Sequence, residues 1–246
     1  MTKKQIKKQL VEYIYGVHSI QELLKAKKRK LVALYTTRPE PKAFKLIQSM
    51  MPPYPVQIQY VEKTKLLQLV GTDDHQGIVA MVQPYGYVKN FFNPKKHPFI
   101  LLLDGVQDVR NVGAILRSAY CTVADGVIIC KKGGASISAA AHKASAGLAE
   151  YISVYQAASI QEAVQMLKQA GYQMYVTAFD GQNAATISYR QPLCIIIGSE
   201  GFGVTRSIIK EGIQITLPQK NDDISYNASV AAGIVLFLAG TKIGRI

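Results

Sequence analysis

The chain has 246 residues, 48% of them hydrophobic, and is therefore long and apolar enough to fill the core of a globular, enzyme-sized protein. Its longest apolar run, residues 228–240, falls short of a membrane span, and the basic opening segment leads to no apolar signal core, so we expect a cytoplasmic protein without a membrane partner. The formal net charge of +13 favours a polyanionic partner.

Positive charge is concentrated in the first 98 residues. This part holds 17 of the 29 Lys and Arg residues but only 6 of the 16 Asp and Glu residues, which gives a net charge of +11. Residues 99–246 carry the remaining +2. The two parts therefore differ in electrostatic character, and we expect the first part to supply most of the attraction to a polyanion.

Residues 1–84 alternate between helical and extended patterns, which predicts a small α/β domain. In chain order, the patterns are helical over residues 19–28, extended over 31–37, helical over 43–50, and extended over 56–61 and 77–83. Residues 85–98 contain Gly, Asn, Pro and Lys but keep no sustained period, so we expect a linker there.

From residue 99 onward, apolar strands alternate with helices. The expected strands are residues 99–105, 125–130, 152–156, 173–181 and 193–201, and the expected helices begin at Asn111 or cover 139–149 and 160–171. This alternation is typical of a mostly parallel, doubly wound sheet, here in a domain over residues 99–246. Ligands of such sheets gather at the carboxyl ends of the strands.

Three loops at strand ends hold residues suited to chemistry. The first, DVRNVGAILRSA, contains Asn111 as an expected helix N-cap and Arg117 deep inside the helix. The second, residues 195–204, places three glycines around Glu200 but lacks the Lys and Ser or Thr of a phosphate-binding P-loop. The third, residues 217–237, opens an apolar helix with SYNAS, whose Ser and Asn side chains are candidate helix caps.

In this order the three loops resemble the motifs of the SpoU (TrmH-like) RNA ribose 2′-O-methyltransferases of the SPOUT superfamily. The matching residues are Asn111, Gly113, Arg117, Ser118 and Ala119 in the first motif, Gly198, Glu200, Gly201 and Gly203 in the second, and Pro218, Ser225, Asn227, Ser229, Val230 and Ala231 in the third. The resemblance covers residues 99–240. It extends to YGVHSIQELLKA and HQGIVAMV, which are similar to segments of the substrate-binding domain in the ribosomal RNA branch.

The resemblance implies an α/β methyltransferase with a C-terminal trefoil knot, preceded by a small RNA-binding domain. It also implies methyl transfer from S-adenosylmethionine to a ribose 2′-hydroxyl, and it favours a guanosine of large-subunit ribosomal RNA, with transfer RNA as the alternative substrate. Family members pair through their knotted domains. Since the helix in residues 225–240 is too apolar to face water, we also expect a homodimer.

The same resemblance assigns the site residues. The catalytic positions are Arg117, Asn111, Glu200 and Asn227, and the cofactor positions are Gly198, Leu217, Ser225 and Tyr226. A guanidinium keeps its proton at any pH below about 12. We therefore expect a charged Arg117 that stabilises the developing alkoxide and orients the nucleotide. Five residues depart from the family pattern, and we expect them to affect the affinity for the cofactor. They are Val109, Gln219, Asn221, Tyr226 and Ala228.

Two alternative functions are left open. A homologue that binds RNA without catalysis would account for the altered motif positions, and a nucleotide-binding oxidoreductase fits the alternation but lacks an early glycine fingerprint. The basic segment KKGGAS, residues 131–136, is either an RNA phosphate contact or a solvated turn. No histidine pair has metal-ligand spacing, so we expect no metal, and we interpret Cys121, Cys130 and Cys194 as buried packing residues.

Overall fold

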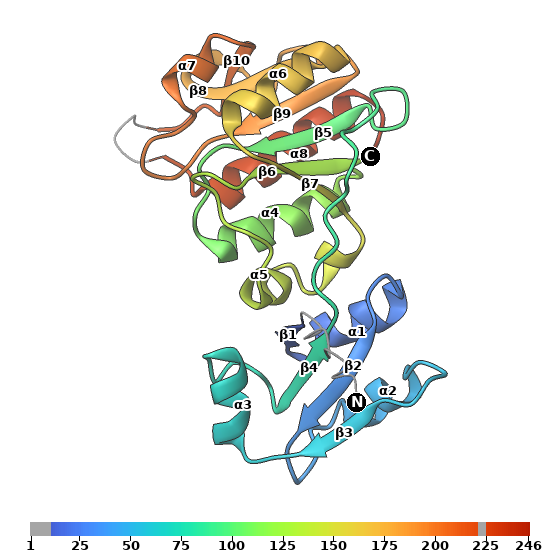
Figure 1. Cartoon of the computed structure of the whole chain (residues 1–246). Helices are drawn as coiled ribbons and strands as arrows, with labels where there is room; N and C mark the ends of the chain where they lie inside the picture. The colour runs from blue at the N-terminus through green and yellow to red at the C-terminus, as the bar shows by residue number, and fades with distance from the viewer. Residues whose placement is uncertain (1–10, 221–224) are drawn as a thin grey trace, which may run out of the picture. The chain divides into compact units, whose positions relative to one another are not determined.

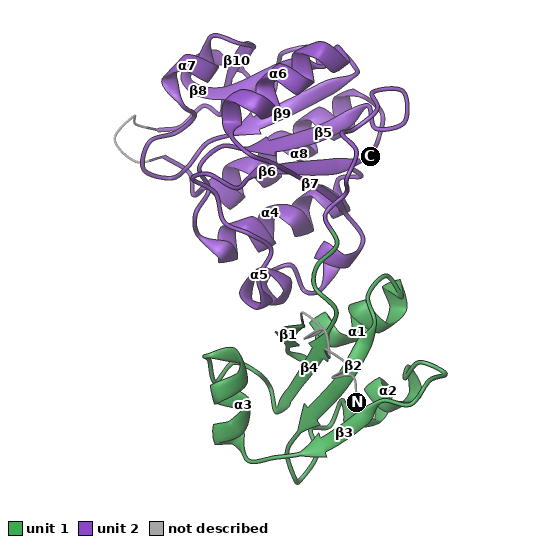
Figure 2. Cartoon of the chain, in the orientation of Figure 1, with its two compact units in different colours: residues 1–86 green, residues 87–246 purple. Residues whose placement is uncertain are grey.

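The structure, a computed structural model, describes residues 11–220 and 225–246. Asn221 and the basic opening segment, both singled out in the sequence, lie outside the described residues. The chain divides into two compact units, Met1–Gly86 and Tyr87–Ile246, which are green and purple in Figure 2. Each unit has its own sheet and its own hydrophobic core.

Unit 1 is built on a four-stranded sheet. Its elements are β1 (Glu12–Tyr15), α1 (Val17–Ala26), β2 (Leu31–Thr36), α2 (Phe44–Ser49), β3 (Gln57–Tyr60), α3 (Lys63–Val70) and β4 (Ile78–Val82). The strand order is β1-β4-β2-β3, with β4 antiparallel to both neighbours and β2 parallel to β3. Ile20 of α1 and Phe44 of α2 are buried against Leu34 and Ile78 of the sheet. The sequence patterns did not reveal β1 or α3.

Unit 2 is built on a six-stranded sheet. Its elements are β5 (Phe99–Leu103), α4 (Val109–Cys121), β6 (Gly126–Cys130), α5 (Ala139–Ala144), the 3-10 turn η1 (Leu148–Glu150), β7 (Ser153–Ala157), α6 (Ile160–Ala170), β8 (Gln173–Asn183), β9 (Leu193–Ile197), α7 (Arg206–Ile209), β10 (Ile213–Thr216) and α8 (Ala228–Lys242). The strand order is β10-β8-β9-β5-β6-β7, and every neighbouring pair is parallel (Figure 1). The predicted α/β fold with a mostly parallel sheet is confirmed, whereas the trefoil knot stays a prediction.

Helices cover both faces of the sheet in unit 2. Ile100 and Leu102 of β5 join the cluster that α6 and α7 cover, whereas Phe99 and Leu101 are equally buried and point to the opposite face. On that face α4 and α8 pack against the sheet and against each other (Figure 1). Burial on both faces explains why β5, β6 and β9 are continuous apolar runs in the sequence.

Two predictions about α4 are wrong. The helix begins at Val109, and its N-cap is not Asn111 but Asp108, whose side chain accepts a hydrogen bond from the Arg110 backbone N–H at 2.8 Å. Cys121 is exposed rather than buried, because it lies on the solvent-facing side of the last helical turn. The other two cysteines are buried as predicted.

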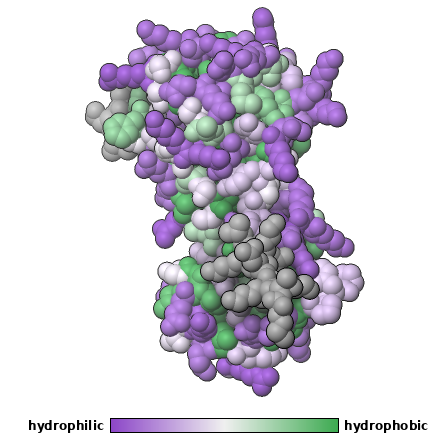
Figure 3. All heavy atoms as spheres, in the orientation of Figure 1, coloured by the Kyte–Doolittle hydropathy of each residue, from purple (hydrophilic) through white to green (hydrophobic). Residues whose placement is uncertain are grey.

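The apolar helix α8 is partly covered by α4. Ala232 and Leu236 are fully buried, but Val230 is 49% exposed and Phe237 is 58% exposed. Elsewhere polar side chains, purple in Figure 3, cover much of the visible surface. Within the two described ranges, no helix is long and apolar enough to cross a membrane.

Gly113 allows α4 and α5 to cross at close range, and we predict that Gly113→Ala destabilises unit 2. A Cβ at this position would lie 2.4 Å from the carbonyl oxygen of Ala141 and 2.6 Å from the Cβ of Ala144, so the two helices must separate. Overpacking of this kind costs about 1–3 kcal/mol, which equals or exceeds the ~1 kcal/mol that alanine gains over glycine in a helix. The free energy of unfolding in urea measures the net effect.

Gly233→Ala in α8 is the matched control for this substitution. The nearest atom to its added Cβ would be the Oγ of Ser118 at 3.4 Å, so the helices stay in place. We expect this variant to keep or raise the free energy of unfolding, because alanine favours the helix. Equal destabilisation by both variants would show that the α4–α5 crossing is not the cause.

Candidate functional site

Three strand ends meet at the carboxyl edge of the six-stranded sheet. β5 and β9 are neighbours whose last residues, Leu103 and Ile197, are paired, so the loops that follow them lie side by side. β10 is two strands away from β9, beyond β8. Because all six strands are parallel, the loops singled out in the sequence leave the sheet at the same edge.

The loop after β9 is a tight turn held by its own backbone. Ser199 and Gly203 exchange two backbone hydrogen bonds, at 3.1 and 2.9 Å. Gly198 lies so close to this pair that a Cβ on it would come within 2.1 Å of the Gly203 carbonyl carbon. Only glycine fits at this close approach, and Glu200 is therefore carried on a turn of defined shape.

Asp104 ties this loop to the neighbouring strand. Asp104 is 6% exposed, and its carboxylate accepts a hydrogen bond from the Thr205 backbone N–H at 2.7 Å. Its own N–H donates to the Ile197 carbonyl at 2.8 Å. Asp104 was not predicted from the sequence, although a carboxylate directly after a fully buried apolar strand was a usable signal.

Asn111 and Glu200 are in direct contact. The Nδ2 of Asn111 donates a hydrogen bond to the Oε1 of Glu200. The Asn111 side chain is available for this contact because Asp108, three residues earlier, caps α4 in its place. The contact joins the first and second sequence motifs, although the two residues are 89 positions apart in the chain.

Arg117 lies on the exposed side of α4. In the part of the chain that the structure describes, its guanidinium has no hydrogen-bond or ion-pair partner. Since a helix repeats every 3.6 residues, Arg110, two turns earlier, lies on the same side and is also exposed. Arg110 was not predicted from the sequence, and its seven-residue spacing from Arg117 was the signal. Two cations thus share one side of the helix that carries Asn111.

The third segment follows β10 and ends in a helix cap. The Oδ1 of Asn227 accepts hydrogen bonds from the backbone N–H of Ser229 at 2.9 Å and from its hydroxyl at 2.6 Å, so Asn227 is the N-cap of α8. Ser225 and Tyr226 are exposed, and 42% of the Tyr226 surface is accessible. Capping therefore accounts for the side-chain oxygen of Asn227 and leaves its amide nitrogen for other partners.

The structure brings together some of the predicted site residues but not all. Asn111 and Glu200 touch, and Arg117 is on the same helix as Asn111. Among the described residues, no hydrogen bond links Asn227 to any of these three. The predicted cofactor positions Gly198, Leu217, Ser225 and Tyr226 follow β9 or β10 at the carboxyl edge.

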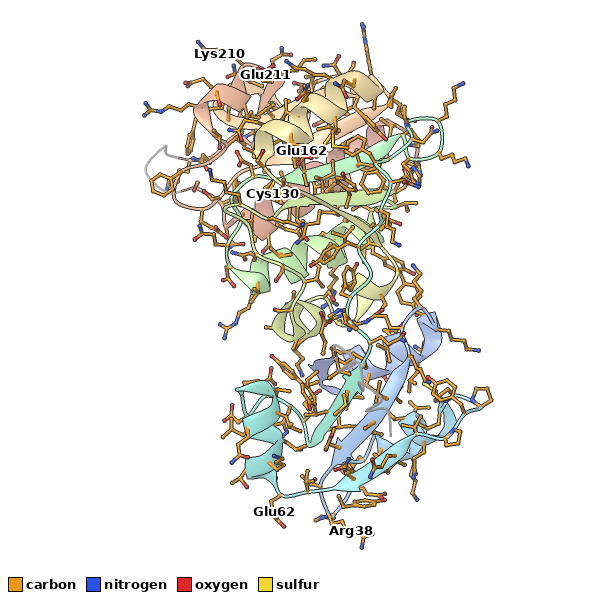
Figure 4. The ribbon with its side chains drawn as sticks, in the orientation of Figure 1. Arg38, Glu62, Cys130, Glu162, Lys210 and Glu211 are labelled. Carbon is orange, nitrogen blue, oxygen red and sulfur yellow. The ribbon has the colours of Figure 1, made fainter. Side chains whose placement is uncertain are left out.

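Cys130 is near this edge but is not a nucleophile. It ends β6, and Figure 4 labels it together with Glu162 of α6. Burial, together with the negative charges of Asp104 and Glu162, raises the pKa of its thiol to about 12. The thiolate is the reactive form, so Cys130 is inert at neutral pH. The described residues also contain no cluster of His, Cys, Asp and Glu side chains that would hold a metal ion.

The arrangement suits a ligand that carries a phosphate and a hydroxyl. Two exposed guanidinium groups supply positive charge for an anion, and guanidinium pairs strongly with phosphate. The Asn111 amide, oriented by Glu200, supplies a fixed polar group on the same helix. Preorganised donors of this kind stabilise an oxygen that gains negative charge during a reaction.

Two family models match the chain. The model described as the SpoU rRNA Methylase family matches residues 98–237, which include all three motifs. The model described as RNA 2′-O ribose methyltransferase substrate binding matches residues 13–88. The first match lies within unit 2, and the second covers most of unit 1 and ends two residues into unit 2.

Individual relatives extend over nearly the whole chain. The Bacillus subtilis (strain 168) protein YacO, of the TrmH family of tRNA/rRNA methyltransferases, is 32% identical over 92% of this chain and 94% of its own. A solved RNA 2′-O ribose methyltransferase is similar in structure with a TM-score of 0.83, at 22% identity over 96% of this chain and 90% of its own. An AdoMet-bound rRNA methyltransferase from Sinorhizobium meliloti has a TM-score of 0.76, at 22% identity over 93% of this chain and 86% of its own.

A double substitution tests whether the side chains of Asn111 and Glu200 interact. Asn111→Asp sets two carboxylates against each other, and their repulsion raises the pKa values of the pair and destabilises the loop. Adding Glu200→Gln recreates a hydrogen bond with donor and acceptor exchanged, so we expect stability to recover. The coupling energy from free energies of unfolding at about pH 8 should be roughly 0.5–3 kcal/mol.

The pH dependence provides a second check on this contact. Because the repulsion raises the folded-state pKa values, the single variant loses its penalty as the pH falls toward about 4, where carboxylates take up protons. Glu200→Gln alone is the control for the loss of the carboxylate. Strictly additive effects of the two substitutions at about pH 8 would mean that the side chains do not interact.

Proposed function

The chain belongs to the SpoU family of RNA methyltransferases, and we propose that it transfers the methyl group of S-adenosylmethionine to a ribose 2′-hydroxyl of ribosomal RNA. The observation that carries this proposal is the contact between Asn111 and Glu200, which unites two family motifs on the helix that also carries the exposed Arg117. A bound nucleotide would meet a charged group, an oriented amide and a tight glycine turn at one edge of the sheet.

We propose that the cofactor is held by backbone and side chains that follow β9 and β10. Gly198, Leu217, Ser225 and Tyr226 are the proposed contacts, and the accessible Tyr226 ring offers an apolar surface. The Nε2 of Gln219 is buried and has no hydrogen-bond partner among the described residues, so a ligand acceptor near this nitrogen would satisfy it. When bound, S-adenosylmethionine supplies a methyl group that is already activated for transfer.

The chain's own groups act on the ribose. A 2′-hydroxyl is weakly acidic, so the residues around it must stabilise the oxygen as its proton leaves. Arg117 is charged at neutral pH, and held against the ribose and its 3′-phosphate, it would stabilise the developing alkoxide. Arg110, on the same side of α4, would add a second phosphate contact. Asn111, oriented by Glu200, would fix the position of the nucleotide.

Unit 1 is proposed to bind the RNA. It contains most of the net positive charge and a cavity of about 880 Å³ lined in part by Arg38, Lys63 and His75. The Arg38 guanidinium lies over the Tyr60 ring, 4.2 Å from its centroid, and is thereby held in place. The Gly77 N–H donates to the Nδ1 of His75 at 3.0 Å, and burial lowers the pKa of His75, so this imidazole is neutral and carries its proton on Nε2.

The finer parts of the proposal concern substrate and assembly. The chain shares both units with the rRNA methyltransferase of Sinorhizobium meliloti, which supports ribosomal RNA over transfer RNA, and we propose a guanosine of the large subunit as the target. We further propose a cytoplasmic homodimer that covers Val230 and Phe237 of α8. A monomeric mass in light scattering would contradict the dimer.

A homologue that only binds RNA is the second candidate function, because Gln219 and Tyr226 depart from the family pattern.

Arg117→Ala should abolish methyl transfer while changing cofactor affinity by no more than a few-fold. The guanidinium acts on ribose and phosphate, and the loss of one such group lowers turnover by about a hundredfold or more. The assay uses labelled S-adenosylmethionine and RNA, followed by alkaline hydrolysis, which spares the linkage after a 2′-O-methylated ribose. Calorimetry measures the affinity for the cofactor.

Arg190→Ala is the matched control for Arg117→Ala. Arg190 is also exposed but lies before β9, at the amino edge of the same sheet, so its loss should leave turnover unchanged. If Arg117→Ala has wild-type turnover, Arg117 does not take part in methyl transfer. If alkali cleaves the labelled RNA fully, including the linkages next to the label, the methyl group is at a position other than the ribose 2′-oxygen.

The role of unit 1 is tested by neutralising two of its cavity residues. The double substitution Arg38→Gln and Lys63→Gln should weaken RNA binding and flatten the slope of log affinity against log salt by about 0.7 to 0.9 for each phosphate that is no longer bound. Cofactor affinity should not change, because these residues are in the other unit. Lys242→Gln at the end of α8 is the control. An unchanged affinity and slope would exclude this cavity from the RNA interface.

A further inference from the structure

A second cavity, of about 470 Å³, lies in unit 2 between the loop that carries Glu200, the loops after β5 and β6, and the start of α6. Its lining includes Gln107, Lys132, Gln161, Glu200 and Phe202. Glu200 is also the partner of Asn111, so this cavity adjoins the candidate site through a shared side chain. Its volume is in the range of about 300 to 1,000 Å³ that is typical of small-ligand sites.

Phe202 gives this cavity an aromatic side chain that does not pack into the core of the protein. It is 96% exposed, so it contributes almost nothing to the core of the folded chain. The turn that carries it is nonetheless well held, since Ser199 and Gly203 pair through their backbones and the Phe202 N–H donates to the Ser199 Oγ at 3.4 Å. A large aromatic face is thus presented to solvent from a turn whose backbone is held, which suits stacking with a planar ligand.

Lys132 is also placed by its backbone. The N–H groups of Lys131 and Lys132 donate to the carbonyls of Ala157 and Ala158 at 2.9 and 3.3 Å. Ala135, at the far end of the turn, donates to the Val106 carbonyl at 3.0 Å. The basic segment 131–136 is therefore fastened to two neighbouring loops, which favours a defined position for its lysines over a freely moving turn.

Lys132 is the cation of the cavity lining, and an anion would bind at its ammonium group. The carboxylates of Asp104 and Glu200 line the cavity, but each already accepts a hydrogen bond, from Thr205 and from Asn111 respectively. At the start of α6, which also lines the cavity, the Ser159 side chain accepts a hydrogen bond from the Glu162 backbone N–H, and the Glu162 carboxylate accepts one from the backbone N–H of Ala158, just before the helix.

We propose that this cavity binds an unpaired nucleobase of the RNA, stacked on Phe202, with a neighbouring phosphate on Lys132. The inference rests on the proposed function, because the base it receives belongs to the strand whose ribose lies at Asn111 and Arg117. Every nucleobase has a planar face, so stacking holds the strand without reading its sequence. The cavity thereby fixes the approach of the strand to the ribose site.

The first test measures binding of a fluorescein-labelled single-stranded oligoribonucleotide to the full chain by anisotropy. Phe202→Ala should weaken binding about tenfold, whereas Phe202→Tyr keeps an aromatic face and should bind like the wild type. Phe202→Leu keeps an apolar side chain without that face and should bind like the alanine variant. Thermal unfolding and cofactor affinity should not change in any of the three, because the Phe202 side chain is almost fully exposed.

The second test compares two adjacent lysines. Lys132 lines the cavity and Lys131 does not, although both are exposed and carry the same charge. Lys132→Gln should lower the slope of log affinity against log salt by about 0.7, and Lys131→Gln should change it less. Equal slopes for the two variants, together with wild-type affinity in Phe202→Ala, would overturn the proposal.

These measurements separate the inference from the function on which it rests. If all Phe202 variants bind the oligoribonucleotide and methylate RNA like the wild type, the cavity is not a nucleobase site, although the methyltransferase proposal stands. If the wild type methylates no RNA ribose, but Phe202→Ala binds the oligoribonucleotide more weakly than the wild type does, the nucleobase site stands and the proposed reaction fails.

Discussion

The hydrogen bond between the Asp104 carboxylate and the Thr205 backbone N–H holds the loop on which the candidate site depends. The loop enters through Gly198, whose lack of a side chain allows its backbone to pack directly against Gly203. It leaves through Thr205, which Asp104 fastens to the end of β5. Because both ends are held, Glu200 can orient Asn111, and Phe202 can remain in solvent without a packing partner.

The sequence predicted the elements that are buried on both faces better than those buried on one. β5, β6 and β9 are fully buried, so their apolar runs stood out. β1 was missed because only its last two residues are buried, and α3 was missed because Leu66 is its one buried residue. The helix expected over residues 139–149 ends early, because Ala146 and Gly147 have left-handed φ values of 52° and 84°, and Gly147 was a usable helix-stop signal in the sequence.

The site could be located from the sequence but not assembled from it. Motif spacing pointed to Asn111 and Glu200, yet Asn111 and Asp108 are both good capping residues, and only the structure decides that Asp108 caps α4 and Asn111 faces Glu200. Lys132 and Phe202 come to one cavity because β6 and β9, the strands before them, both pair with β5. No local pattern encodes that neighbourhood, because strand order is a property of the whole sheet.

The exposure of Cys121 makes α4 a helix that can be modified selectively. Burial raises the pKa of Cys194, and burial with neighbouring charge raises that of Cys130, so a maleimide reagent meets one accessible thiol among three. Cys121 follows Arg117 by one helical turn and on the same side of the helix. An adduct on this thiol would therefore crowd the guanidinium, and with the role proposed for Arg117, alkylation would inhibit methyl transfer although no thiol is assigned a part in it.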